Sequence, residues 1–170
     1  MTDKVLASLF QRLIHALDDE LQSHAHLLEI ILEETQALRK GRLPEILDVG
    51  AKKGDAFRQS EAAAHKRAET IAKIVAHMGL EASVSFVQMA ACADIATRQV
   101  LTRYREKFAD IVNRIEEANE INRQIIALTL AHVSNNLNFI HNISSSIPNY
   151  DQQGQIKAGN LQGRLISQAG

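Results

Sequence analysis

LTRYREKFADIVNRIEEANEINRQIIALTLAHVSNNLNFIHNI, residues 101–143, contains neither glycine nor proline. Mostly apolar residues recur along it at spacings of three and four, the periodicity of one side of a helix in a coiled coil. The members of this seam are Leu101, Tyr104, Phe108, Ile111, Ile115, Ala118, Asn122, Ile125, Thr129, Val133, Leu137, Ile140 and Ile143. The stretch therefore predicts one long helix.

A similar seam runs through residues 3–39, which also lack glycine and proline. The pattern stops at Gly41, after two basic residues, and Pro44 followed by Glu45 suits the first turn of a new helix. We therefore expect a tight hairpin of two long helices.

The second helix is expected to extend from Pro44 to Met78, because Gly79 ends its pattern. Gly50 and Gly54 weaken its interior, so tertiary packing must compensate. Leu43, Leu47 and Phe57 are among the residues expected to supply that packing.

Ser85 begins the third helix in this interpretation, since Gln88 three residues later completes a capping box. No glycine or proline then occurs before Pro148. This helix is longer than the first two, so either it bends near its Ala-rich start or one end projects beyond the bundle. Cys92, within that Ala-rich start, is expected to be a small core residue.

The predicted fold is all-α: an elongated antiparallel bundle of three long helices with coiled-coil-like packing. The bundle is assigned to residues 1–147. Residues 148–170 are rich in Gly, Gln, Ser and Asn, and are expected to form a flexible tail that a partner binds. An inert terminus is the alternative for this tail.

Composition restricts the classes of function. Apolar residues make up 45% of the 170, aromatic residues only 4%, and the net charge is −1. A near-neutral chain lacks the general attraction of a nucleic-acid binder. The single cysteine fits a reducing compartment, and no apolar run indicates a signal peptide or stable membrane insertion. We expect a cytoplasmic protein.

No arrangement of residues indicates catalysis. His24 and His26 point to opposite sides of a helix, while His65 and Glu69 share a side but lack further ligands. There is no Gly-rich phosphate loop and no recognisable nucleophile motif. We expect no enzyme activity, no metal and no cofactor.

Several short motifs occur in a familiar order. ALRKGRLPEIL at 37–47 is followed by Lys53 and Arg67, NEINRQII at 119–126 and NYDQQG at 149–154. In this order and over nearly the whole length, the chain resembles the FlgN family of flagellar type III export chaperones. The interior glycines of the second helix and the Asn-rich stretch SNNLNF depart from the family pattern.

The resemblance implies a cytoplasmic chaperone that binds C-terminal helical segments of hook-associated proteins, the proteins of the hook–filament junction. It also implies delivery of these partners to components of the export apparatus. A structural coiled-coil scaffold, or another small helical export regulator, is the alternative. Self-association into a homodimer stays open.

A chaperone of this kind needs an apolar surface for an amphipathic helix. The candidate partner-binding residues lie at the end of the third helix and in the tail. They are Leu137, Phe139, Ile140, Ile143, Ile147, Tyr150, Gly154, Ile156 and Leu161. Phe139 is the member most expected to be exposed, because it lies beside the seam.

The NEINRQII motif contributes Asn119, Asn122, Ile125 and Ile126. Its asparagines could contact a partner, or they could fix helix register from within the bundle. We favour the structural role, because a buried Asn in a seam specifies alignment.

Overall fold

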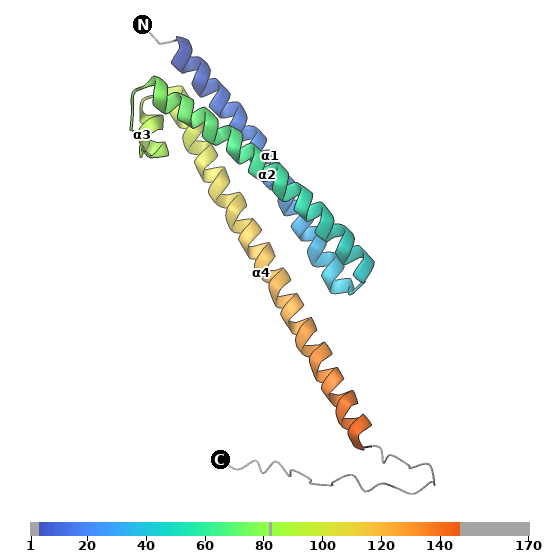
Figure 1. The fold of residues 1–170 in the computed structure, drawn as a ribbon. Coiled ribbons are helices and arrows are strands. Elements are labelled where there is room, and N and C mark those ends of the chain that lie inside the picture. The colour runs from blue at the N-terminus through green and yellow to red at the C-terminus, as the bar shows by residue number, and fades with distance from the viewer. Residues whose placement is uncertain (1–3, 82, 147–170) are drawn as a thin grey trace, which may run out of the picture. The chain divides into compact units, whose positions relative to one another are not determined.

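A computed structural model describes residues 4–81 and 83–146, with side chains up to residue 143. Its elements are α1 (Lys4–Lys40), α2 (Leu43–His77), α3 (Phe86–Ala91) and α4 (Ile95–Ser146) (Figure 1). All regular elements in the described residues are helices, which confirms the all-α prediction. None of these helices is long and apolar enough to cross a membrane.

The first two helices form the predicted hairpin. Gly41 has a φ of 65°, a left-handed conformation that glycine adopts without steric cost. Its amide donates to the Ala37 carbonyl oxygen, 3.1 Å away, which closes the end of α1. Pro44 then lies in the first turn of α2, where its missing amide proton costs no helical hydrogen bond.

The third helix is not continuous from Ser85 but is interrupted within its Ala-rich start, so a short helix precedes the third of the three long helices that were predicted. Ser85 and Gln88 form the predicted capping box, but the helix that it starts, α3, has only six residues. The Asp94 carboxylate starts α4 by accepting hydrogen bonds from the backbone amide and hydroxyl of Thr97, at 2.9 and 2.7 Å. The described residues thus form four helices, three of them long.

The prediction that Cys92 is a small core residue was wrong. Its side chain is exposed, whereas Met89, Ala90 and Ala93 are buried. The Arg98 guanidinium donates to the carbonyl oxygen of Ala91 at 2.5 Å and thereby ties α4 to the last residue of α3.

The chain divides into two compact units, residues 1–126 and 127–170. The described part of the second unit is the end of α4, residues 127–146. The predicted boundary at 147/148 lies outside the described residues, as does the tail, and both stay predictions.

The first unit has two apolar clusters, each built from α1, α2 and α4. One also includes α3 and consists of Phe10, Leu13, Leu17, Ile74, Met89, Ala90, Ala93 and Leu101. The other consists of Leu27, Leu28, Ile30, Ile31, Ala37, Val49, Ala56, Ile111 and Ala118. Between them, α1 carries the polar residues Glu20 and His24. The core is therefore apolar in two blocks with polar side chains between them.

The packing face of α2 differs from the predicted one. Leu43, Leu47 and Phe57 are exposed, by 64%, 64% and 54%. The buried residues of α2 are Val49, Ala56, Ser60, Ala63 and Ile74. Most of these are small, and small side chains let two helix backbones approach closely, so the face was set by size as well as by hydrophobicity.

Candidate functional site

The end of α4 exposes a set of large apolar side chains. Every described side chain from residue 127 to residue 143 is exposed. The large apolar ones are Leu128, Leu130, Val133, Leu137, Phe139, Ile140 and Ile143, with exposed fractions from 47% to 73%. Scattered apolar residues are normal on a surface, but a concentration along one helix indicates an interaction surface.

Four of these residues form a regular row. Leu130, Val133, Leu137 and Ile140 follow one another at spacings of three, four and three, so they lie on one side of the helix. We call these four residues the distal stripe. Leu128 and Phe139 are eleven positions apart and lie on another side of the helix, and Ile143 lies at the edge of the stripe.

The surroundings of the distal stripe are uncharged. Arg123 is the last charged residue before it and Asp151 the next one after it. The flanking positions hold Thr, Ser, Asn and His, and the Asn136 side-chain nitrogen lies 3.1 Å from His132 Nε2. Charges at flanking positions normally set partner choice in helix pairs. The distal stripe therefore offers apolar contact without charge selection.

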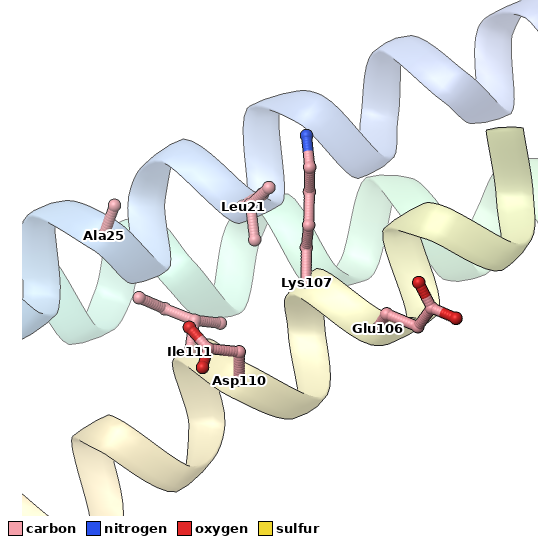
Figure 2. A pocket seen from close by; sticks show the side chains of 6 residues that line it. All are labelled: Leu21, Ala25, Glu106, Lys107, Asp110 and Ile111. Atoms are coloured by element: carbon pink, nitrogen blue, oxygen red, sulfur yellow. The ribbon is translucent and has the colours of Figure 1, made fainter.

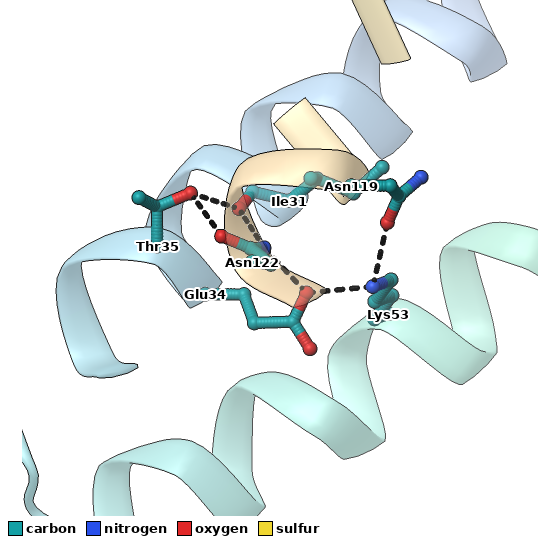
Figure 3. Close-up of polar contacts among 6 residues, drawn as sticks. All are labelled: Ile31, Glu34, Thr35, Lys53, Asn119 and Asn122. Carbon is teal, nitrogen blue, oxygen red and sulfur yellow. Dashed lines mark hydrogen bonds and ion pairs between the residues drawn. The ribbon is translucent and has the colours of Figure 1, made fainter. Parts of the chain in front are cut away.

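A polar layer connects α4 to the hairpin at Asn122, which is buried (Figure 3). Its amide nitrogen donates to the Ile31 carbonyl oxygen at 3.1 Å and to Glu34 Oε2 at 2.8 Å. Its amide oxygen accepts from the Thr35 hydroxyl at 2.6 Å. Asn122 thus pairs with α1 through three hydrogen bonds.

Lys53 of α2 completes the same layer (Figure 3). Its Nζ lies 2.6 Å from Glu34 Oε2 and donates to the Asn119 side-chain oxygen at 3.0 Å. The Glu34 side chain is only 16% exposed, so its charge needs this cation. Ile125 is half-buried and Ile126 is exposed. Asn122 is thus buried and Asn119 half-buried, and both form hydrogen bonds within the first unit. Their role in fixing helix register stays a prediction.

A second polar layer lies between the two apolar clusters. Arg67 Nε donates to Glu20 Oε2 at 2.5 Å, and the Glu20 side chain is 5% exposed. Nearby, the Tyr104 hydroxyl donates to Asp18 Oδ1 at 3.0 Å. Burial raises the pKa of the Tyr104 phenol, and its hydrogen bond to Asp18 raises it further. Both layers thus pair acids of α1 with donors from other helices.

Lys53 and Arg67, which carry part of the family resemblance, are the cations of these two layers. Sequence reasoning named both residues but missed their partners, Glu34 and Glu20. Spacing along the sequence gives no signal for such pairs, because the partners lie on different helices.

A pocket of about 430 Å³ lies between α1 and α4 in the first unit (Figure 2). Its apolar residues are Leu21, Ala25 and Ile111. Lys107 extends towards α1 beside Leu21, and Glu106 and Asp110 line the pocket as well. A lysine and two acids around a short aliphatic surface present no consistent charge to a ligand, so this pocket suggests no particular function.

The histidines form no candidate catalytic site. His65 Nδ1 lies 3.3 Å from Glu69 on the exposed side of α2. His24 packs edge-on against Phe108, with ring centroids 5.7 Å apart. Within residues 4–81 and 83–146, no group of three or more His, Cys, Asp or Glu side chains could hold a metal ion.

Of the predicted partner-binding residues, the structure describes Leu137, Phe139, Ile140 and Ile143, and all four are exposed. Ile147, Tyr150, Gly154, Ile156 and Leu161 lie outside the described residues. Leu128 and Leu130, which are as exposed, were missing from the prediction. The absence of charged residues after Arg123 is the sequence feature that could have indicated Leu128 and Leu130 as part of the surface.

The FlgN protein family model matches residues 1–158. Comparison with curated proteins and with solved structures gives no match. Because the matched region covers most of the 170 residues, the chain belongs to the FlgN family, a family of flagellar export chaperones and not of enzymes.

Proposed function

We propose that this chaperone works in the cytoplasm, where it binds the C-terminal helical segments of hook-associated proteins and delivers them to the type III export apparatus. The observation that carries the proposal is the exposed, uncharged end of α4 with its distal stripe. A partner helix with an apolar stripe of its own can pack against it in coiled-coil fashion.

The expected affinity comes from apolar burial. Full burial of a Leu, Ile or Val side chain contributes roughly 1.5–3 kcal/mol, from which the cost of ordering both segments is subtracted. Because residues 124–150 carry no Asp, Glu, Lys or Arg, we expect this affinity to change little with ionic strength. Release requires no chemical step, since nothing covalent holds the two helices.

Residues Ile147, Tyr150, Gly154, Ile156 and Leu161 are proposed to extend the same surface. The isolated apolar side chains among them cannot form a core alone, but together they can cover part of a partner that the helix has already bound. Amide exchange after residue 147 should then slow when a hook-associated protein binds. Equal exchange with and without the partner would argue against this role.

Two double variants test the docking surface. Leu130→Ala with Leu137→Ala removes half of the distal stripe, and Phe139→Ala with Ile143→Ala removes side chains beside it. Loss of anchors from such an interface costs a few kcal/mol, so at least one variant should bind a hook-associated protein about 30-fold or more weakly. The variant with the larger loss identifies the side of the helix that the partner covers.

The matched control is Leu47→Ala with Phe57→Ala, which removes exposed apolar groups of the same types from α2. Affinity is measured by calorimetry and stability by thermal unfolding for all three variants. The control should bind normally, and the α4 variants should keep the wild-type melting temperature. An α4 variant that unfolds early, yet binds normally while folded, would contradict the docking role.

Self-association is a second candidate function of this surface, either as a homodimer or as a scaffold. Its supporting observation is the same absence of charge, since two copies of α4 would meet there without like-charge repulsion. Sedimentation of the chain alone, and of Leu130→Ala with Leu137→Ala, measures it. A concentration-independent monomer would exclude it.

A further inference from the structure

A second pocket in the first unit has both apolar walls and an excess of positive charge. It measures about 350 Å³, and all four helices contribute to it. We propose that it binds a short acidic and apolar peptide segment of a partner protein, in which an Asp or Glu adjoins a Phe or Leu. None of its residues belongs to the distal stripe, so this proposal does not depend on the docking surface above.

The walls of the pocket suit one large apolar side chain. They include Leu17 of α1, Phe86 of α3, and Phe108 and Val112 of α4. Phe86 and Phe108 are half-buried, so each keeps part of its ring accessible. A volume of about 350 Å³ is at the lower end of the range for ligand sites. The pocket therefore fits a side chain with its neighbouring group better than a whole cofactor.

The charges of the pocket favour one carboxylate. Glu20 is paired with Arg67 through the Nε of the guanidinium, and this contact neutralises one positive charge. Arg105 adds a second cation, and its side chain is in no hydrogen bond or ion pair within the described residues. Cations thus exceed anions by one, and an Arg side chain can hold a carboxylate through two parallel hydrogen bonds.

An excess of one positive charge fits a peptide with a single acid better than it fits a more highly charged anion. A single surplus cation is too little for nucleic acid, whose binding requires several phosphate contacts. The chain's own residues 147–170 have one acid, Asp151, against Lys157 and Arg164. Their charge does not complement the pocket, so a segment of another protein is the better occupant.

The test uses the full-length protein and four probes. The first is acetyl-Ala-Phe-Asp-Leu-amide. The second replaces Asp with Asn, the third replaces Phe with Ala, and the fourth is the small molecule 3-phenylpropanoate. Titrations are followed by NMR through the backbone amides of Glu20, Phe86 and Arg105. The Phe-Asp peptide should shift these amides and bind about fivefold or more tightly than either altered peptide, because each loses one of the two contacts.

Two arginine variants locate the carboxylate contact. Arg105→Gln should reduce the affinity for the Phe-Asp peptide to that for the Phe-Asn peptide. Arg103→Gln removes the same charge from an exposed position two residues away that does not line the pocket, and it should change nothing.

Four results would overturn the proposal. They are no shift of the pocket amides at millimolar peptide, equal binding of the Asp and Asn peptides, equal losses for the two arginine variants, or tighter binding of 3-phenylpropanoate than of the peptide. The last result would identify a small-molecule site instead.

Discussion

The two parts of α4 have the same apolar periodicity, but the apolar side chains are buried in the first part and exposed in the second. In the first unit, Leu101, Ile111 and Ala118 are buried at spacings that suit a seam. In the second unit, Val133 and Leu137 continue the same seam, yet they are 47% and 60% exposed. Periodicity thus shows that a helix has an apolar side, but it does not show whether the same chain covers that side.

Charge separates the two parts where periodicity does not. Between Arg98 and Arg123, α4 carries many acidic and basic residues on exposed positions, whereas no Asp, Glu, Lys or Arg occurs from residue 124 to residue 150. Charged outer positions keep a packed helix soluble. A helix that lacks them while it exposes leucines is better explained by a partner that covers it.

Leucine truncation tests this comparison most directly, and its effect should be the largest. Leu101→Ala removes a completely buried side chain, so it should lower the free energy of unfolding by about 2–5 kcal/mol. Leu137→Ala changes an exposed position and should stay within about 0.5 kcal/mol of wild type. Urea unfolding followed by circular dichroism measures both variants. Similar losses would mean that residues around Leu137 are packed in solution.

Two adjacent lysines of α2, Lys52 and Lys53, allow an exposed ion pair to be compared with a half-buried one. Lys53→Met leaves the half-buried Glu34 carboxylate with the Asn122 amide alone, and should cost about 1–3 kcal/mol of stability. Lys52→Met breaks an exposed pair with Asp48 and should have no measurable effect.

Adding Glu34→Gln to Lys53→Met should recover much of the loss, because it removes the uncompensated charge. Urea unfolding of the two single variants and of the double variant provides the measurement. A double variant as unstable as Lys53→Met alone would show that the charge of Glu34 is not the cause.

Much of the fold follows from local chemistry, so the sequence could predict it. Gly41, Pro44 and the Ser85–Gln88 capping box act within one helical turn, and the structure has all three features. A bend in the Ala-rich start of the third helix was one of two alternatives, but the cap at Asp94 that fixes its position was not identified, although it is also local. An acid followed by Thr three residues later is a weaker cap signal than a complete capping box, and the alanines around it are good helix formers.

The side chains that pack in the core were harder to predict from the sequence than the ends of the helices. Large apolar residues such as Leu47 and Phe57 were expected to face the core of the hairpin, but small residues such as Ala56 and Ser60 occupy it. At the candidate site, the sequence indicated an apolar end of α4. It could not indicate which acids Lys53 and Arg67 neutralise, since those contacts exist only once the helices have packed.

Glycine positions in and beside α2 offer a comparison with a smaller effect. A Cβ added at Gly50 would meet no atom within 4 Å, so Gly50→Ala should raise stability by about 0.5–1 kcal/mol through better helix propensity. Gly41→Ala is the control, because a φ of 65° strains any L residue, and it should lower stability by about 1 kcal/mol. Thermal unfolding distinguishes them. A loss at Gly50 would show that this open side of α2 is covered in solution.

The smallest expected effect concerns the cap that starts α4. Hydrogen bonds from the Thr97 amide, and next from its hydroxyl, lower the pKa of the Asp94 carboxyl below its ordinary value. A group whose pKa is lower in the folded state stabilises the fold above its unfolded pKa of about 3.9, and this contribution disappears as the pH falls through the folded pKa. Wild type should therefore be slightly more stable than Asp94→Asn at pH 6, since Asn can cap the helix but carries no charge.

The difference should shrink between about pH 5 and pH 2 as Asp94 takes up its proton. Melting temperatures of both proteins across this range provide the measurement, and the other acids contribute equally to each. Because Asp94 is exposed, the difference should also decrease in high salt. A difference that stays constant on acidification would show that the carboxylate's charge contributes nothing to the start of α4, and that the break after α3 depends on the packing of Ala93 and Leu101 alone.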